Sequence, residues 1–418
     1  MKKTCIYPVS LLFFLFSTAA TAKWDGNWVT TIWNEMSVCH SSLGYDVAAG
    51  PIWNNDDAKR KCPAVIEKAE QQNICRNYVN NATPNIETPS ESQPSNSISA
   101  KDYNLPGDAG RDNLSQLKEF LTTAKSQGKI AWFPAGTYNH SDVLVIDGMQ
   151  VQGAGHATIF NATNPDKSAI KLTGSQSSII NIKTTVSAPS RSSMPDAAAI
   201  LIQNAAGARV GNMFIQGASS NGVRIDNSSG AMVANNLVVG TNADGIAIMN
   251  GSTENKVTKN IVTQAADDSY SDDSYKGDQR QDEFNVFDGN VSLNNAYGRG
   301  ICLAGSKKAT VKNNIVSGSK WYGIYADADT DSGTMQSSEH IIQDNTVINP
   351  PSADTLPVLA SPDKSPGTRV TGTKTTGSLP DLKSILGWDP GNIPDRYSFT
   401  RYQPGTGSGA NNSGGNRS

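Results

Sequence analysis

The feature that most constrains the fold is an asparagine that recurs before short apolar runs through the middle of the chain. The seven copies are Asn181, Asn212, Asn236, Asn260, Asn290, Asn314 and Asn345. They are 31, 24, 24, 30, 24 and 31 residues apart, so one unit recurs and some copies carry an insertion of six or seven residues. A unit of this length, rich in short β-like runs and without helical spacing, is typical of a parallel β-helix.

Physical chemistry supports this fold class. Asparagine tolerates the left-handed backbone conformation that a tight corner between two strands requires. Stacked asparagines can also hydrogen-bond from one coil to the next. Coils about 4.8 Å apart give a stack roughly 30 Å long over seven rungs. A β-sandwich is the alternative, and it leaves the regular spacing to coincidence.

A helix is expected just before the β-rich region, over residues 113–124. Asp112 or Asn113 would cap its start, and Gly128 would stop it. Its apolar residues follow helical spacing, at Leu114, Leu117, Phe120 and Leu121. We expect the helix to cover one open end of the stack, because uncovered strand edges invite aggregation.

The N-terminus has the pattern of a secretory signal peptide over residues 1–22. Two lysines precede an apolar run, and the small residues Ala20-Thr21-Ala22 follow it. The run is too short for a membrane anchor, and no later segment is apolar enough to span a bilayer. We therefore expect a bacterial protein that is periplasmic or secreted, and a monomer. The formal net charge of −3 does not favour a nucleic-acid partner.

Composition divides the remainder into four parts. Residues 23–85 form a small region rich in Trp and Cys, 86–100 a polar linker, 101–350 the β-helix and 351–418 a tail rich in Pro, Gly and Ser. Within the tail, 382–390 is expected to be a short docking segment or a cap at the far end. One disulfide is expected among Cys39, Cys62 and Cys75, with the pairing open, and Cys302 is expected to be a free thiol.

Aligning the coils on their asparagines places a second set of turns in one column. The column consists of Asn221-Gly222, Asp244-Gly245, Asp268-Ser269, Arg299-Gly300 and Tyr322-Gly323. Residues in one column of a β-helix are neighbours, so Asp244, Asp268 and Arg299 should lie within a few ångströms, with Asp267 beside them. Carboxylates this close raise one another's pKa unless a cation intervenes, which favours a functional site over purely structural turns.

The longer coil after these aspartates adds a loop at 271–284, which is expected to wall the site. Its candidate substrate-binding residues are Tyr275, Lys276 and Arg280. The column supplies Asn221 at one end, and Lys320 and Trp321 lie beside Tyr322 at the other. For any single residue of this loop, a merely solvated position is the competing interpretation.

The entry segment resembles that of the pectate-lyase-like superfamily of right-handed β-helix enzymes. The resemblance is carried by "GDAGRDNLSQLKEFLTTA", then "FPAGTY" and "VQGAG", and it covers roughly residues 101–350. It implies an all-β, right-handed, single-stranded solenoid with an N-terminal helix cap, preceded here by the small Trp/Cys segment.

Three motifs resemble those of polygalacturonase-type hydrolases within that superfamily. "NAD" (242–244), "ADD" (266–268) and "GRG" (298–300) are similar to their Asn-x-Asp, x-Asp-Asp and Gly-His-Gly motifs. Arg299 stands where a hydrolase has histidine. The downstream Arg-x-Lys of that family is replaced by "KWYGIYAD".

These departures favour the chemistry of related lyases, which eliminate the substituent β to a uronate carboxylate. The resemblance implies aspartates holding Ca²⁺, here Asp244, Asp267 and Asp268, with Arg299 or Tyr322 exchanging the proton. These five are the expected catalytic residues. The expected activity is a lyase that cleaves an acidic exopolysaccharide and remodels biofilm matrix, similar to enzymes of the Vibrio type.

Three alternatives stay open at the level of sequence. Paired aspartates can hydrolyse a glycosidic bond unaided. A uronate C5-epimerase shares the proton abstraction, although the Asp-Pro-His motif of those enzymes is absent. A carbohydrate-binding β-helix would use the column only for structure.

Overall fold

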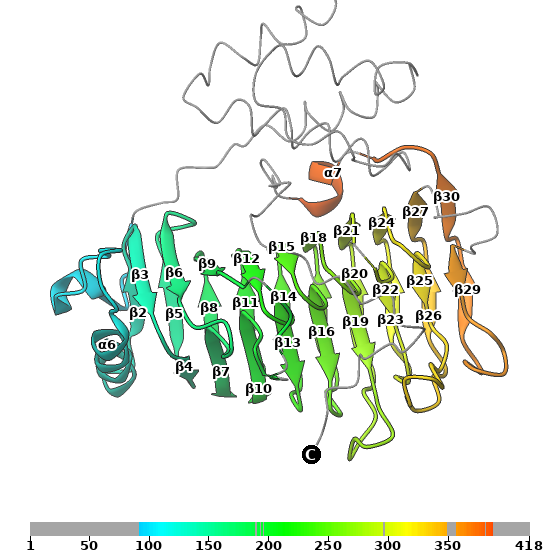
Figure 1. Cartoon of the computed structure of the whole chain (residues 1–418), viewed down its shortest axis with the longest axis horizontal. Coiled ribbons are helices and arrows are strands. Elements are labelled where there is room, and N and C mark those ends of the chain that lie inside the picture. The colour runs from blue at the N-terminus through cyan, green and yellow to red at the C-terminus, as the bar shows by residue number, and fades with distance from the viewer. Residues whose placement is uncertain are drawn as a thin grey trace, which may run out of the picture.

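The computed structural model describes residues 92–348 and 357–387, except residues 189, 193, 195, 296 and 381. The regular secondary structure of the described chain is almost entirely β-strand, wound into three parallel sheets that run side by side along one axis (Figure 1). The predicted fold class, a right-handed parallel β-helix, is confirmed. We call the three sheets A, B and C, in the order in which each coil passes through them.

The elements have the following bounds. Sheet A contains β1 (Ser97–Ser99), β2 (Ile130–Phe133), β5 (Gln150–Gly153), β8 (Ser178–Ile180), β11 (Arg209–Gly211), β14 (Met232–Ala234), β17 (Lys256–Thr258), β20 (Val286–Asp288), β23 (Thr310–Lys312), β26 (Ile341–Gln343) and β29 (Arg369–Thr371). Sheet B contains β3 (Gly136–His140), β6 (Thr158–Ala162), β9 (Lys183–Val186), β12 (Phe214–Ala218), β15 (Leu237–Thr241), β18 (Ile261–Thr263), β21 (Val291–Leu293), β24 (Ile315–Ser317), β27 (Thr346–Ile348) and β30 (Lys374–Thr376). Sheet C contains β4 (Leu144–Asp147), β7 (Ile170–Ser175), β10 (Ile200–Ala206), β13 (Val223–Asp226), β16 (Ile246–Met249), β19 (Tyr270–Asp273), β22 (Ile301–Cys302), β25 (Ile324–Tyr325) and β28 (Val358–Leu359). The described helices are η1 (Ala100–Tyr103), α6 (Leu114–Ser126) and α7 (Leu382–Leu386).

The register is set by apolar side chains that stack inside the coils. In sheet C, Val223 pairs with Ile246, which pairs with Tyr270, and all three side chains are fully buried. On these strands the neighbouring residue points outward, because side chains alternate between the two faces of a strand. The outer face of sheet C can therefore carry polar groups without disturbing the core.

At the corner between sheets A and B, the residue with left-handed backbone conformation and the residue that stacks in the buried ladder occupy two different positions. The sequence pattern had treated them as one position. The left-handed position holds Asn181 and Asn212, with φ of 57° and 50°, but in later coils it holds the residue before the repeated asparagine. Those later positions are Asn235, Lys259, Gly289, Asn313 and Asp344. The predicted alignment was therefore wrong by one residue at Asn181 and Asn212.

The remaining five asparagines form the predicted ladder. The side-chain amide of each donates to the side-chain oxygen of the next, over 2.9 to 3.1 Å, from Asn236 through Asn260, Asn290 and Asn314 to Asn345. All five side chains are buried. The ladder satisfies polar groups inside the corner that burial would otherwise leave without partners.

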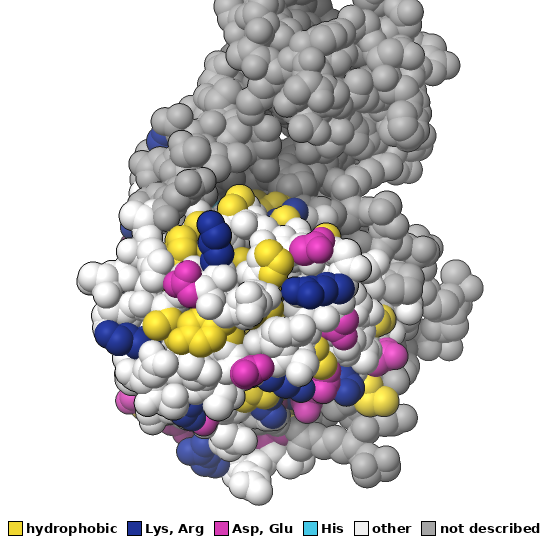
Figure 2. Space-filling view, turned by 90° about the vertical axis from the view of Figure 1, so that its left-hand side faces the viewer, with side chains coloured by type: hydrophobic (Ala, Val, Ile, Leu, Met, Phe, Trp, Pro, Cys, Tyr) yellow, Lys and Arg dark blue, Asp and Glu magenta, His cyan; other side chains and the backbone are white. Residues whose placement is uncertain are grey.

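The predicted cap helix is confirmed as α6, which packs on β2 and β4 at one end of the stack (Figure 1). Asn113 is the N-cap residue, while the side chain of Asp112 accepts the backbone N–H of Leu114 over 3.0 Å. On this helix, the side chains of Leu117 and Phe120 are buried. Viewed from this end, the surface shows basic, acidic and apolar side chains interspersed (Figure 2). The helix thus presents a mixed, charged surface in place of open strand edges.

The β-helix extends past both predicted limits of 101–350. Strand β1 precedes residue 101, and β28, β29 and β30 continue all three sheets after residue 350. Within the predicted tail, α7 buries Leu382 and Leu386 against apolar residues on the outer face of sheet B, including Ile261 and Val291. The segment at 382–390 therefore docks on a sheet in its described part.

Several predictions lie outside the described residues. They concern the signal peptide, the region 23–85 with its three cysteines, residues 86–91 of the linker, and the chain after residue 387. Cys302 is described, and it is a free, buried thiol as predicted. No helix in the described ranges has the length and apolar character needed to cross a membrane.

Candidate active site

The predicted column exists, at the turn that leads into sheet C. Consecutive coils are joined there by backbone hydrogen bonds. The bonds are Gly222 N–H to Asp244 O (3.1 Å), Gly245 N–H to Asp268 O (2.9 Å), Ser269 N–H to Arg299 O (3.0 Å) and Gly300 N–H to Tyr322 O (3.1 Å). Side chains one coil apart in this column are therefore neighbours, as the repeat indicated.

A glycine follows Asp244 because the turn approaches its neighbours too closely for a side chain. A Cβ atom at Gly245 would lie 2.2 Å from Cγ1 of Val262 and 2.6 Å from the carbonyl oxygen of Ser269. The turn can then pass close above the strand, which directs the Asp244 side chain outward.

Three carboxylates converge at the centre of the column, and we call Asp244, Asp267 and Asp268 the carboxylate trio. One oxygen of each lies within 4.8 Å of the others. Asp244 and Asp268 are buried, with 7% and 3% of their surface exposed. Asp267 is the accessible member, with 29% of its side chain exposed.

Asp244 receives its hydrogen bonds from uncharged donors. The backbone N–H of Asp268 donates to Oδ1 over 3.1 Å, while Asn221 Nδ2 and Ser271 Oγ donate to Oδ2 over 3.2 and 3.1 Å. Burial, followed by the charges of Asp267 and Asp268, raises the pKa of Asp244 to about 8. Asn221 is itself buried, and the contact described for its side chain is the hydrogen bond that it donates to Asp244.

Asp268 differs because it contacts Arg299. The backbone N–H of Arg299 donates to Oδ1 over 2.5 Å, and Nη1 lies 3.5 Å from Oδ2. Burial raises the pKa of Asp268 to about 6, and the charge of Arg299 opposes that rise. At neutral pH the trio therefore contains a carboxyl group that holds its proton beside one that has lost it.

Arg299 is held on several sides. Its Nη2 lies 3.4 Å from Asp329 Oδ2, Nη1 contacts Cys302 Sγ over 3.8 Å, and the guanidinium carbon is 4.4 Å from the centre of the Tyr325 ring. Burial disfavours its charge, but Cys302, Asp268 and Asp273 outweigh burial and keep the pKa of Arg299 above its ordinary value. Arg299 is thus a fixed positive charge.

Two residues at the site, Arg191 and Asp329, escaped the sequence-based prediction, and a third, Asp273, belongs to the predicted segment 271–284 but was not singled out as a site residue. Arg191, from the segment between β9 and β10, places Nη1 3.3 Å from Asp267 Oδ2. Asp329 follows β25 and pairs with Arg299. Asp273 is buried at the end of β19, where burial raises its pKa and Cys302 Sγ donates to it over 3.6 Å. None of the three belongs to a recurring motif. That Asp273 lies on the outward face of sheet C, like the column, becomes clear only from the strand register.

At the far end of the column, the Tyr322 ring lies 5.8 Å from that of Tyr325, and the backbone carbonyl of Tyr322 accepts the N–H of Gly300, the residue after Arg299. Trp321 is 56% exposed. Lys320 is exposed, and its backbone N–H donates to Asn295. The contact of these residues with substrate stays a prediction.

The loop residues lie at the opposite end of the sheet C strands. The backbone N–H of Lys276 donates to Gly333 O over 3.1 Å, and Arg280 Nη2 donates to Asn227 over 2.9 Å. Tyr275 lies within this loop and is half-buried. The described contacts of Lys276 and Arg280 therefore attach them to other turns, whereas Ser271 at the start of the 271–284 segment contacts Asp244.

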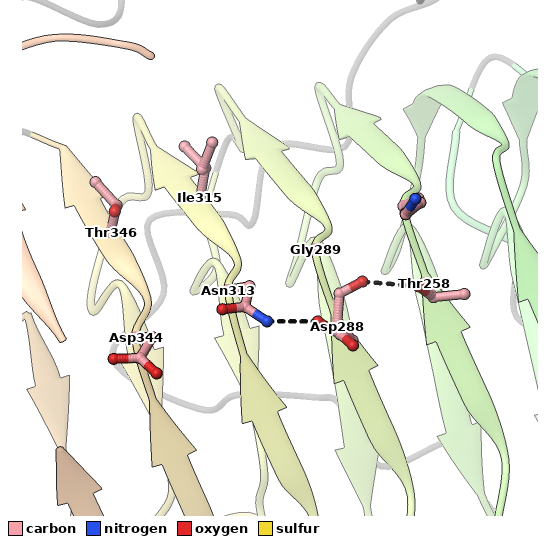
Figure 3. A pocket seen from close by; sticks show the side chains of 8 residues that line it. Thr258, Asp288, Gly289, Asn313, Ile315, Asp344 and Thr346 are labelled. Atoms are coloured by element: carbon pink, nitrogen blue, oxygen red, sulfur yellow. Dashed lines mark hydrogen bonds between the residues drawn. The ribbon is translucent and has the colours of Figure 1, made fainter. Parts of the chain in front are cut away.

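A groove of about 430 Å³ lies elsewhere, on the corner between sheets A and B (Figure 3). In it, Asn313 Nδ2 donates to Asp288 Oδ1 over 2.9 Å. Its lining comes from the left-handed corner and the start of sheet B, and the column contributes no residue to it. We therefore do not assign it to the site.

Residues 97–301 match a family model described as "Rhamnogalacturonase A/epimerase, pectate lyase-like". Over these residues the β-helix is similar to a pectate lyase-like family. This confirms the resemblance at the level of the superfamily, while the closer likeness to a Vibrio enzyme stays a prediction. The comparison with curated proteins gives no match.

Solved structures share the fold at low sequence identity. The catalytic unit of the GH87 alpha-1,3-glucanase from Streptomyces thermodiastaticus is 17% identical, with a TM-score of 0.56 over 68% of this chain and 56% of that chain. PfbA, a surface adhesin of Streptococcus pneumoniae, is 12% identical, with a TM-score of 0.52 over 67% of this chain and 77% of that chain. The chain thus spans little more than half of the glucanase structure, and the structures that share its fold include one named as an enzyme and one named as an adhesin.

Proposed function

We propose that this protein cleaves an acidic, uronate-containing polysaccharide by β-elimination, outside the cytoplasm and in the matrix of a biofilm. The observation that carries the proposal is the pairing of Asp244 and Asp268. They lie on adjacent coils, and their pKa values are raised to about 8 and about 6. Together they provide an acid and a base in one column, beside the fixed charge of Arg299.

In this mechanism Asp268 takes the proton from C5 of the uronate. The electron pair of the C5–H bond forms the C4=C5 double bond, and the bond from C4 to the glycosidic oxygen breaks. Asp244, which holds its proton at neutral pH, donates it to that leaving oxygen. General acid–base catalysis of this kind contributes typically about 10²- to 10⁴-fold.

Arg299 takes a different role from the proton exchange expected from the resemblance. Arg299 pairs with Asp268 and Asp329, which stabilise its charged form. It is therefore a poor proton acceptor. Its contribution is electrostatic, because it favours the ionised form of Asp268 over that of Asp244. Tyr322 and Trp321, at the end of the column, are the proposed contacts with neighbouring sugars, since aromatic rings can stack on sugar rings.

The carboxylate trio also fits Ca²⁺, which prefers several oxygen ligands. Asp244, Asp267 and Asp268 would hold the ion, which would neutralise the carboxylate of the substrate. This use excludes the proton transfers proposed above, because an aspartate that ligates Ca²⁺ is not free to hold or take a proton. Arg191 already pairs with Asp267, and Arg299 with Asp268, so these carboxylates have positive partners without a metal ion. We therefore propose the direct acid–base arrangement.

Hydrolysis is the second candidate, and the same pair of carboxyl groups favours it. A protonated Asp244 and an ionised Asp268 match the general acid and the base or nucleophile of a glycoside hydrolase. The glucanase with the same fold is named for a reaction of this class. The two reactions differ only in whether Asp268 acts on C5–H or on the anomeric centre and water.

One experiment separates these outcomes. The purified protein is incubated with a panel of uronate-containing exopolysaccharides, while ultraviolet absorbance of unsaturated sugars and new reducing ends are followed together, with and without a chelator. We expect both signals to rise in parallel and to survive chelation. Reducing ends without absorbance would establish hydrolysis, loss on chelation would establish the cation-dependent form, and silence of both on the native polymer would leave a binding protein.

A further inference from the structure

We infer that Arg191 is the residue that binds the carboxylate of the substrate and thereby selects acidic sugars. This inference rests on the proposed acidic substrate, but it concerns a residue that lies outside the column and its motifs. It follows from a contrast between the two arginines at the carboxylate trio: one is held by the protein, and the other is open.

Arg191 reaches the trio from a segment that lies beside the column. Its neighbour Ser192 donates its backbone N–H to Ser219 O over 2.9 Å. Asn242, which lies two residues before Asp244, donates its side-chain Nδ2–H to Ala188 O over 3.1 Å. The segment is therefore fixed to two successive coils, and Arg191 extends to Asp267 on the next one. Its position is set by tertiary contacts on both sides.

The guanidinium groups of the two arginines differ in what they can still bind. Arg299 contacts Asp268, Asp329, Cys302 and the Tyr325 ring, and 18% of its side chain is exposed. Arg191 is 27% exposed, and within the described part of the chain its one recorded bond joins Nη1 to Asp267. Since arginine carries five N–H donors, most of those on Arg191 remain available to a ligand.

The chemistry of the site explains why such a group is needed. The carboxylates of Asp267 and the ionised Asp268 lie with oxygens within 4.8 Å of each other, and they repel a sugar acid that approaches them. The partly exposed guanidinium of Arg191 beside Asp267 offsets that repulsion, and its planar fork matches a carboxylate with two parallel hydrogen bonds. Arg191 is thus placed to accept a uronate where Asp268 can reach C5, whereas a neutral sugar gains nothing from it.

The test measures equilibrium binding in an Asp268→Asn background, which removes the proposed base. The probes are the acidic polysaccharides of the panel, oligosaccharides of galacturonate, mannuronate and guluronate, and the carboxyl-reduced form of each. We expect Arg191→Gln to weaken binding of the acidic probes about 10- to 100-fold, the usual effect of hydrogen bonds to a charged group. It should leave binding of the reduced probes unchanged. Arg191→Lys should recover part of the affinity, and Arg209→Gln, at an exposed arginine on β11, should have no effect.

Equal affinity of Arg191→Gln and the background protein for the acidic probes would overturn the inference. So would an equal loss on acidic and reduced probes, which would mean that Arg191 only supports Asp267, and so would a background protein that binds no acidic probe. If the wild-type chain cleaves nothing but binds acidic probes through Arg191, the inference stands and the proposed reaction fails.

Discussion

The backbone N–H of Arg299 lies 2.5 Å from Asp268 Oδ1, and its side-chain Nη1 lies 3.5 Å from Oδ2 of the same carboxylate. Asp244, one coil earlier, is hydrogen-bonded instead by an amide, a hydroxyl and a peptide N–H. Both carboxyl groups are buried to a similar degree, so burial alone would raise both pKa values together. The contact with Arg299 is what separates them, and that separation is the basis of the proposed chemistry.

Replacement of either buried carboxyl group should remove turnover without unfolding the protein. For Asp244→Asn and Asp268→Asn we expect kcat to fall by about 10²- to 10⁴-fold, because each variant lacks one of the two proton-transfer groups. Initial rates and circular dichroism spectra check this. Asp288→Asn, on the corner between sheets A and B, is the matched control and should keep full activity. If both site variants retained wild-type rates, the column would be structural.

The rate should depend on pH as a bell. Activity requires ionised Asp268 and protonated Asp244, so kcat/KM should rise as pH passes about 6 and fall as pH passes about 8. Because the two groups interact, the two apparent values belong to the pair. Initial rates from pH 4 to 10 at constant ionic strength measure the profile. A rate that keeps rising above pH 9 would show that Asp244 is not the acid.

Buried asparagines of the ladder should matter more for stability than exposed corner residues. Asn290 donates to Val257 O and to Asn314, and it accepts the N–H groups of Asn260. Asn290→Ala leaves several of these buried groups unpaired, so we expect a loss of about 2 to 4 kcal/mol in the free energy of unfolding. Asn313→Gly is the control, since glycine adopts its φ of 57° without strain. Denaturant titration of both variants decides, and equal losses would contradict the ladder's role.

The free energy of unfolding should also fall as the pH rises, because of a fully buried carboxyl group on strand β19 of sheet C. Burial raises the pKa of Asp272 to about 8, while Asn285 Nδ2 donates to both of its oxygens over 3.2 and 3.3 Å. Between about pH 4 and 8 the folded protein holds a proton that the unfolded chain has released. The free energy of unfolding therefore declines by roughly 1 kcal/mol per pH unit for this group.

Asp272→Asn should flatten that decline, since an amide does not titrate. Thermal unfolding temperatures of the two proteins, measured from pH 5 to 9, make the comparison. The nearby buried Asp282 keeps part of the slope, because burial raises its pKa as well. Parallel curves for wild type and variant would show that Asp272 does not control the alkaline side.

The sequence determined the coil and the column, for a simple reason. In a parallel β-helix one repeat of sequence equals one step along the axis, so residues one repeat apart become neighbours. Asp244, Asp268 and Arg299 could be placed together on that ground alone. The same rule located the buried asparagine ladder, but it missed by one residue at Asn181 and Asn212, where the spacing alone cannot separate a left-handed corner from the position after it.

The tertiary structure decided which groups complete the site and in what ionisation state. Arg191 and Asp329 come from segments between strands whose lengths vary between coils, so no periodic pattern predicts their neighbours. Burial and the contact between Asp268 and Arg299 set the two pKa values, and both depend on how the coils pack. Repeat spacing fixes a position along the axis of the solenoid. The distance a loop extends from it, and what it touches there, is fixed only by packing in three dimensions.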